Sequence, residues 1–264
     1  MLANDSMTER SPAPLLEVRG VSKAYGHVQA LLDVSMHVDA GEIVALVGDN
    51  GAGKSTLVKM IAGAHGPDQG AILVSGEDLE FHSPLGARER GIETVYQDLA
   101  LAPDLSVWAN LFLGREQYVH GPGRIFGWMN KRAMRERAQA ELARLQIPIP
   151  DVDVAVDDLS GGQRQAVAVA RSIAWGRRLV MMDEPTASLG VQEQEKVEAL
   201  VRRLAEHRVA VLLVSHNLTQ VFVLAQRIVV LRRGRRVAVR STAETTHEEI
   251  VGLITGAIEG DRAE

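Results

Sequence analysis

The sequence predicts an α/β protein in which a sheet of buried strands is covered by helices. Two observations predict this class. Short, continuously apolar segments recur along the chain, as buried strands require, and several are flanked by stretches with helical character. The chain has 264 residues, of which 46% are hydrophobic and 24% charged, so it can form one domain, or one domain with a subdomain, around a real core.

The first strands are expected directly after a polar N-terminal tail. Residues 1–14 contain no apolar stretch of the kind that a secretory signal needs, and we expect them to be flexible. Leu15–Arg19 and Leu31–Val38 alternate between apolar and polar residues, and the turn-forming Gly26 lies between them. This pattern predicts that a sheet starts in residues up to about Val38.

The buried strands of the main sheet follow. The first of them leads through a glycine-rich loop into Ser55–Ala62, which has helical character, so the order is strand, loop, helix. The later strands are apolar runs of similar length, separated by helical stretches, as in a sheet with helices packed against it. The predicted strands are Glu42–Val47, Ala71–Val74, Ile92–Tyr96, Leu179–Met182, Val209–Val214 and Ile228–Leu231.

A mainly helical insertion interrupts this pattern at about 100–175. Within it, Lys131–Leu145 carries four apolar residues on one face among many charges, as an amphipathic helix does. These are Met134, Ala138, Leu142 and Leu145. We therefore expect an insertion subdomain inside a single domain over residues 15–256, followed by a C-terminal tail at 257–264.

Charge and composition exclude several classes of partner and site. The formal net charge of −5 lacks the basic footprint of a protein that lives on nucleic acid, so no nucleic-acid partner is expected. The chain has no cysteine, which excludes disulfides, thiolate metal sites and a cysteine nucleophile. The longest apolar runs, Ile43–Val47 and Val209–Val214, are far shorter than the ~20 residues that span a bilayer. Any membrane association is expected to be peripheral.

The one dense basic cluster, Arg232–Arg236, has two interpretations. A group of arginines can bind anionic lipid. Gly234, however, lies midway between Ile228–Leu231 and Val237–Val239, so we favour a solvated hairpin turn flanked by arginines.

The segment Gly48–Thr56 has the pattern of a phosphate-binding P-loop, G-x-x-x-x-G-K-[ST], between a strand and a helix. Glycines lack a Cβ atom, so the loop can curl until its N–H groups point at phosphate oxygens, and the helix N-terminus adds positive charge. Lys54 is expected to neutralise the β- and γ-phosphates of ATP, and Ser55 to bind Mg²⁺. The remaining residues expected to hold the nucleotide are Gly48, Asn50, Gly51, Ala52, Gly53 and Thr56.

Two carboxylates follow the buried strand at Leu179–Met182. Asp183 lies at the strand end, where a second contact to magnesium is needed. Glu184 next to it can accept a proton from the water that attacks the γ-phosphate, and Pro185 stiffens the turn. Taken alone, Asp-Glu-Pro after a strand also fits an ordinary helix start.

A second glycine-rich helix start occurs at Leu159–Gln163, which reads LSGGQ. Ser160 can cap this helix, and the free N–H groups of the first turn make a second anion site. With the helix that follows, the stretch LSGGQRQAVAVARS resembles the signature motif of ABC ATPases, so Ser160, Gly161, Gly162 and Gln163 are expected to contact ATP. Ala166, Val169, Ala170 and Ile173 repeat at helical spacing and are expected to be core.

Three further residues match ABC landmarks in family order. The resemblance implies that Tyr25 stacks on adenine, that Gln97 contacts magnesium and couples to the transporter, and that His216 holds the γ-phosphate. Taken singly, each also fits a simpler role: a core aromatic at a strand edge, a solvated loop amide and a helix cap. The family fold is a P-loop NTPase (RecA-like) core with an antiparallel β subdomain and a helical insertion subdomain.

The resemblance is strongest to the monosaccharide-import cassettes of the ribose and fructose type. It covers about Leu15 to Gly256 and rests on GDNGAGKST, ETVYQDLALAPDLSVWANLFLGRE and MDEPTASLG. The D-loop usually reads SALD, whereas Ala187–Gly190 ends in glycine here, as in the sugar-import group. Because fewer than ~30 residues follow Val239, we do not expect the long C-terminal regulatory domain of maltose-type cassettes.

The resemblance also implies partners. With one P-loop per chain, two copies are expected to close around two ATP molecules, each held between the P-loop of one subunit and the signature loop of the other. The homodimer would act with membrane permease subunits and, indirectly, a sugar-binding protein, at the cytoplasmic face of the inner membrane. The alternative is a soluble ABC ATPase of translation or DNA repair, which usually brings two cassettes, coiled coils or basic arms that are not evident here.

Overall fold

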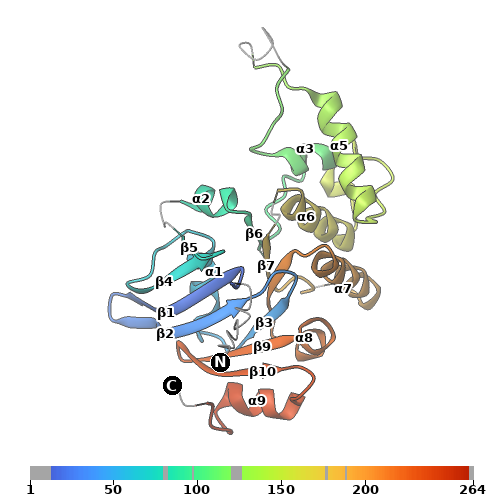
Figure 1. Ribbon diagram of the computed structural model, residues 1–264. Coiled ribbons are helices and arrows are strands. Elements are labelled where there is room, and N and C mark those ends of the chain that lie inside the picture. Colours follow the sequence, from blue (N-terminus) through green and yellow to red (C-terminus); the bar gives the residue numbers. More distant parts are fainter. Residues whose placement is uncertain are drawn as a thin grey trace, which may run out of the picture.

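The computed structural model describes residues 13–79, 83–96, 98–119, 127–175, 178–187 and 189–261. These residues form two sheets with helices around them and an insertion that projects from one end (Figure 1). The predicted fold class, an α/β protein with a P-loop NTPase core, is confirmed.

The smaller sheet is antiparallel and has the order β2-β1-β4-β5. Its strands are β1 (Leu16–Tyr25), β2 (Val28–Val38), β4 (Gln69–Val74) and β5 (Glu77–Asp78). β1 is longer than the sequence suggests. Its register with β2 shifts between Val18 and Val21, so the strict alternation of side chains is lost there although pairing continues to Tyr25.

The larger sheet has the order β10-β9-β3-β8-β7-β6. All its neighbouring strands are parallel except β9 and β10. The loops that leave its parallel strands therefore gather at one edge. The strands are β3 (Ile43–Val47), β6 (Ile92–Val95), β7 (Leu179–Asp183), β8 (Ala210–Val214), β9 (Arg227–Arg232) and β10 (Arg235–Ser241).

Both faces of this sheet are buried. Along β3, Ile43, Ala45 and Val47 belong to one apolar core, whereas Val44 and Leu46 belong to the other. This explains why the strand is continuously apolar instead of alternating. The surrounding helices are α1 (Lys54–Ile61), α2 (Pro84–Glu89), α6 (Gly161–Trp175), α7 (Val191–Glu206), α8 (Leu218–Leu224) and α9 (His247–Thr255).

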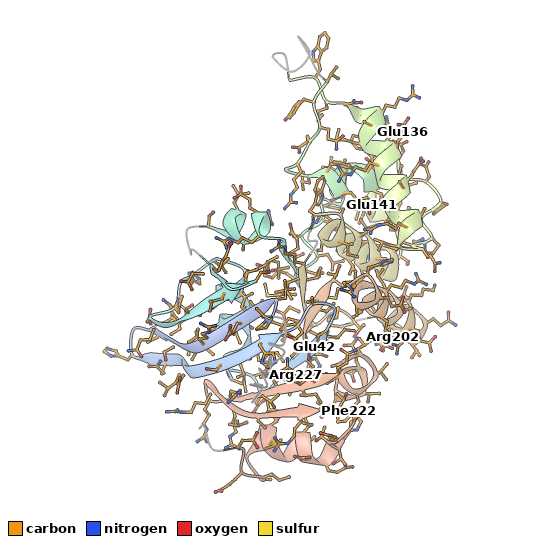
Figure 2. All side chains as sticks on the ribbon, viewed as in Figure 1. Glu42, Glu136, Glu141, Arg202, Phe222 and Arg227 are labelled. Carbon is orange, nitrogen blue, oxygen red and sulfur yellow. The ribbon has the colours of Figure 1, made fainter. Side chains whose placement is uncertain are left out.

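The described part of the predicted insertion contains α3 (Val107–Phe112), α5 (Lys131–Arg144), the short 3-10 helix η1 (Val156–Asp158) and α6, and both α3 and α5 pack against α6. All four apolar residues expected on one face of α5 are buried, Met134, Ala138, Leu142 and Leu145. Side chains on the opposite, polar face, such as Glu136, are exposed; Figure 2 shows Glu136 and Glu141 along this helix.

The basic cluster forms the turn of a hairpin between β9 and β10, as predicted. Arg233 and Gly234 both have positive φ angles, 50° and 76°, which is the conformation of a tight two-residue hairpin turn. After α9 the chain runs back along β10, where the N–H of Asp261 donates to the carbonyl oxygen of Val237 at 2.7 Å. None of the helices in the described part of the chain is long and apolar enough to cross a membrane.

Candidate functional site

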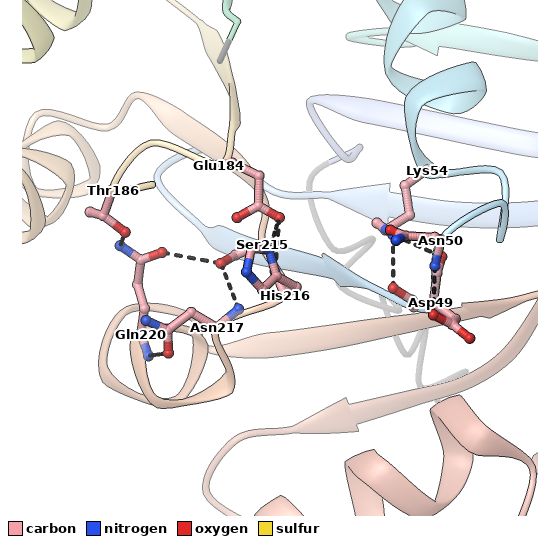
Figure 3. Close-up of polar contacts among 10 residues, drawn as sticks. Asp49, Asn50, Lys54, Glu184, Thr186, Ser215, His216, Asn217 and Gln220 are labelled. Atoms are coloured by element: carbon pink, nitrogen blue, oxygen red, sulfur yellow. Dashed lines mark hydrogen bonds and ion pairs between the residues drawn. The ribbon is translucent and has the colours of Figure 1, made fainter. Parts of the chain in front are cut away.

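The polar residues expected to bind and hydrolyse a nucleotide follow the ends of three parallel strands. Leu46 of β3 and Asp183 of β7 both pair with Val214, the last residue of β8, so the three strands end level with one another. Lys54, Glu184 and His216 lie just beyond these ends. Figure 3 shows their side chains at the same edge of the sheet.

The phosphate loop needs glycine for two reasons: neighbouring backbone leaves no space for a Cβ atom, and some of its residues have positive φ angles. A Cβ atom on Gly48 would lie 2.2 Å from the carbonyl oxygen of Leu231, and one on Gly53 would lie 2.7 Å from that of Ala30. Gly51 and Gly53 have φ angles of 77° and 103°, which other residues rarely adopt. The loop therefore keeps a shape that side chains would destroy.

The lysine of the loop is turned toward its own backbone. Lys54 Nζ donates to the carbonyl oxygens of Gly48 at 2.7 Å and Asp49 at 3.0 Å. Helix α1 begins at Lys54 with no side chain capping its first N–H groups, and Ser55 in its first turn is exposed. Free N–H groups, a lysine and a hydroxyl thus meet where a phosphate would lie.

Asp183 is half-buried beside a second carboxylate. Burial and the negative charge of Glu184 raise the pKa of Asp183, and the charge of Lys54 opposes this rise. Two adjacent carboxylates with one nearby lysine suit a divalent cation, which would stabilise the charged form of Asp183. Among the described residues no group of three or more His, Cys, Asp or Glu side chains could hold a metal alone. Magnesium fits here with a hydroxyl, one carboxylate and phosphate oxygens as ligands.

Glu184 and His216 contact each other directly. One carboxylate oxygen of Glu184, Oε1, accepts hydrogen bonds from the backbone N–H of His216 at 3.0 Å and from its Nδ1 at 2.6 Å. The side chain of His216 is 77% exposed, whereas that of Glu184 is 17% exposed. Glu184 also has a φ angle of 52°, a strained conformation of the kind that clusters at functional sites.

The signature loop is capped as predicted. Ser160 Oγ accepts from the N–H of Gln163 at 3.2 Å, and Gln163 Oε1 accepts from the N–H of Ser160 at 3.0 Å, which is a capping box. Gly162 packs tightly on α7, since a Cβ atom there would lie 3.0 Å from Cβ of Glu193.

Beside the signature loop lies a cavity of about 490 Å³. It is lined by residues 145–148, by α7, and by Ser160, Gly162, Gln163 and Ala166, and none of the described residues of Gly48–Thr56 contributes to it. The signature loop and the phosphate loop are therefore not lining residues of one pocket.

Of the predicted core positions on α6, Val169, Ala170 and Ile173 are buried and Ala166 is partly buried. Tyr25 ends β1 with 45% of its surface exposed, and the ring of His65 meets it edge-on at 6.1 Å. An exposed ring at this strand end is available for stacking.

Gln97 lies outside the described residues, so its role stays a prediction. The segment after it is tied to the signature helix, because Arg171 of α6 donates to the carbonyl oxygens of Leu99 at 2.9 Å and Ala100 at 2.8 Å. In the D-loop, Gly190 is the N-cap of α7.

One support of the phosphate loop is not evident from the sequence. The N–H of Gly234 donates to the carbonyl oxygen of Ala52 at 3.0 Å, and the N–H of Leu32 donates to the carbonyl oxygen of Gly234 at 2.7 Å. The β9–β10 turn, which we expected to be solvated, therefore supports the phosphate loop through hydrogen bonds. The only signal in the sequence is the glycine between arginines, and it says nothing about a partner 182 residues earlier.

Comparison with known proteins agrees with this geometry. A family model described as ABC transporter matches residues 31–187. The chain is 49% identical to the xylose/arabinose import ATP-binding protein XylG of Sulfolobus acidocaldarius, over 91% of this chain and 94% of that protein. It is 46% identical to the fructose import ATP-binding protein FrcA of Rhizobium meliloti, over 94% of this chain and 96% of that protein. The ribose import ATP-binding protein RbsA of Rhodococcus jostii is 40% identical over 92% of this chain, which spans 47% of that relative.

Solved structures give the same result. The ADP conformation of an ATP-binding cassette of an ABC transporter matches with a TM-score of 0.77 and 25% identity, over 92% of this chain and 95% of that one. A dimeric cassette in a post-hydrolysis state, bound to ADP and Pi, matches with a TM-score of 0.70 and 25% identity, over 86% of this chain and 98% of that one. With the phosphate loop, the paired carboxylates and the signature loop in place, the chain belongs to the ABC transporter family, as an ATP-binding and ATP-hydrolysing subunit.

Proposed function

We propose that this subunit energises the import of a monosaccharide. The similar proteins that the chain matches along nearly its whole length are named for import of xylose/arabinose and fructose. The observation that carries the catalytic part is that Lys54, Asp183, Glu184 and His216 all lie at or just beyond strand ends at one edge of the sheet. The soluble ABC ATPase of translation or DNA repair is the less favoured alternative.

In this proposal the phosphate loop holds the ATP phosphates. Lys54 leaves the carbonyl oxygens of Gly48 and Asp49 and turns to the β- and γ-phosphates, while the N–H groups of residues 50–55 and the Thr56 hydroxyl surround the α- and β-phosphates. Ser55 and Asp183, with Gln97, would hold Mg²⁺, which supplies positive charge against the phosphate oxygens. Tyr25 stacks on adenine.

Glu184 is proposed to accept the proton of the attacking water. One of its two oxygens, Oε1, is occupied by His216 in the structure, and a swing of the His216 side chain removes its Nδ1 from this oxygen so that it can accept a proton from water. The exposed imidazole can then turn to the γ-phosphate. Binding of the γ-phosphate and release of the base are thus parts of one movement.

We propose that the second half of each site comes from another copy of the chain. Gly161 and Gly162 offer N–H groups at the start of α6, whereas those of Ser160 and Gln163 are used in the capping box. Ser160, Gly162 and Gln163 line a cavity apart from the phosphate loop. A homodimer would bring the signature loop of one subunit onto the ATP of its partner, as a sandwich of two nucleotides.

The remaining parts of the proposal concern assembly. Residues 15–256 form one ATPase domain whose insertion, about 100–175, meets membrane permease subunits near Gln97. The assembly lies at the cytoplasmic face of the inner membrane, receives sugar through a binding protein, and has no nucleic-acid partner.

The test is sugar uptake by cells in which the gene is deleted and restored. Uptake of labelled xylose, arabinose, fructose and ribose should fall for at least one sugar, return with the parental gene, and stay low with the Glu184→Gln gene expressed at the same level. Unchanged uptake of a broad monosaccharide panel, with slowed growth or translation instead, would favour the soluble alternative.

A further inference from the structure

Behind the contact between Glu184 and His216 lies a second, buried connection between the same two loops. Gln220 of α8 is 2% exposed. Its Nε2 donates to Thr186 Oγ1 at 2.8 Å, and its Oε1 accepts from Ser215 Oγ at 3.2 Å. Thr186 and Ser215 are 5% and 1% exposed. Figure 3 shows this chain of contacts beneath the Glu184 carboxylate.

Gln220 thus bridges the hydroxyl groups of Thr186 and Ser215, and both hydroxyl groups belong to residues next to or near the proposed catalytic pair. Thr186 lies two residues after Glu184, and Ser215 lies directly before His216. The turn after β7 is therefore joined to the end of β8 and its loop in three ways: at the surface through the Glu184–His216 pair, through the backbone N–H of Glu184, which donates to the carbonyl oxygen of Val214 at 2.9 Å, and inside through Gln220. Of these, the bridge through Gln220 is the one that reaches past Glu184 to Thr186 and past Val214 to Ser215.

The two side-chain connections differ in how easily they break. The surface pair is open to water, with the His216 side chain 77% exposed, so an incoming phosphate can replace it. The buried bridge has no water to replace its bonds, and a hydroxyl left there without a partner is costly. The Gln220 bridge does not involve the His216 side chain, so a movement of that side chain leaves it intact.

An amide is well suited to this place. It presents one donor and one acceptor, and here the donor meets Thr186 and the acceptor meets Ser215. The helix that carries Gln220 is fixed at the same loop, because Asn217 Oδ1 accepts from the N–H of Gln220 at 3.3 Å and Ser215 Oγ accepts from the N–H of Asn217 at 3.1 Å.

We propose that Gln220 is a positioning residue for hydrolysis, which holds the loops of Glu184 and His216 at a fixed separation while the contact between their side chains opens. This rests on the roles proposed above for Glu184 and His216. Gln220 itself does not touch the nucleotide in this proposal, so it should affect the rate of hydrolysis and not the binding of ATP.

The first test is the basal ATPase activity of the full-length chain with Gln220→Leu. We expect kcat to fall about tenfold or more, because small displacements of a base are costly, with KM for ATP within about threefold of parental. The matched control is Asn110→Leu. Asn110 is fully buried in the insertion and bonds Ala102 and Leu105 through its amide, so its loss should lower thermal stability with kcat retained.

The second test is Gln220→Glu. A buried carboxyl group has a raised pKa, and its protonated form offers a donor and an acceptor as the amide does. The activity of this variant relative to the parent should therefore rise as pH falls from about 8 to about 6. Taking the ratio removes titrations that both proteins share.

The third test separates this inference from the proposed function. Glu184→Gln should stop turnover, and Gln220→Leu added to it should have little further effect, because both act through one base. Parental kcat in Gln220→Leu, or an equal loss of kcat in Asn110→Leu, would overturn the inference while leaving Glu184 as base. Parental turnover in Glu184→Gln would instead overturn the assignment of the base, and the inference with it.

Discussion

Gly234, in the turn between β9 and β10, donates its backbone N–H to the carbonyl oxygen of Ala52 in the phosphate loop, at 3.0 Å. Its φ angle is 76°, and a Cβ atom there would lie 2.8 Å from the carbonyl oxygen of Ala30. The hairpin and β2 therefore close on the phosphate loop at a point where no side chain fits.

The first prediction concerns this contact. Gly234→Ala should strain the turn by about 1–3 kcal/mol and weaken ATP binding roughly tenfold, because the loop loses its outer support. Calorimetric titration with ATP measures this. Gly76→Ala is the control: Gly76 also has a positive φ, 82°, but open space around it, so that variant should lose stability and keep ATP affinity. Equal affinities in both variants would contradict the prediction.

Lys54→Ala should remove nucleotide binding. The loop would have to hold several phosphate charges without its lysine, at a cost of about 3 kcal/mol or more than a hundredfold in Kd. Lys59 lies on the exposed side of the same helix, so Lys59→Ala serves as the control and should bind ATP normally. Normal affinity in Lys54→Ala would refute the assignment of the phosphate loop.

Tyr25→Ala should weaken the binding of ATP and GTP alike, by roughly 1–3 kcal/mol, which is the scale of an aromatic–base stack. Stacking tolerates any base because every base has a flat face. The measurement is the pair of dissociation constants, and a loss confined to ATP would indicate hydrogen-bond readout instead.

Mixing two inactive variants should restore activity if the sites are shared between subunits. Ser160→Arg blocks the signature loop and Lys54→Ala blocks the phosphate loop, so each homodimer has two defective sites. A mixed dimer has one complete site and one with both defects. Random mixing should restore up to roughly a quarter of parental ATPase activity, and less if hydrolysis at one site requires hydrolysis at the other.

The readout is the hydrolysis rate against mixing ratio, with light scattering to follow dimers. Each variant mixed only with itself is the control and should stay inactive. If ATP never produces a dimer, even with Glu184→Gln to slow turnover, the shared site is wrong.

The C-terminal segment should be sensitive to acid. Arg240 pairs with Glu249 and Asp261 at 2.7 and 2.8 Å, and these hydrogen bonds lower the pKa of both carboxyl groups. Carboxyl groups with a lowered folded-state pKa contribute stability above their ordinary pKa of about 4 and lose it as pH falls through the folded-state values.

Arg240→Met should therefore cost about 1 kcal/mol at pH 7, a small value because both carboxylates are partly exposed. The difference in unfolding free energy from the parent should shrink below about pH 4. Denaturant titrations at several pH values measure it, and a difference that does not change with pH would rule out the ion pairs as its source.

The sequence by itself determined the family and most of the strands. The motifs that follow one another in family order, from Tyr25 to His216, identify an ABC ATPase, because each needs particular residue types at particular spacing. Five of the six apolar runs also predicted strands of the main sheet, because strands buried on both faces are mostly apolar. The placement of the sixth, Ala71–Val74, was wrong: it belongs to β4 of the smaller sheet, where it pairs antiparallel with β1. Some observed strand ends differ by a few residues from the predicted ones. In β1, for example, pairing with β2 sets the end of the strand, and the hydrophobic pattern does not.

Only the tertiary structure decided how the site is held. Gly234 bonds Ala52, which lies 182 positions earlier in the sequence, and Gln220 bonds Thr186, which lies 34 positions earlier. No local sequence pattern encodes these contacts. Sequence motifs specify groups that touch a ligand, because their chemistry demands those residue types. The residues that fix these groups in place act through packing and hydrogen bonds between strands brought together by folding, so their partners are known only once the sheet is formed.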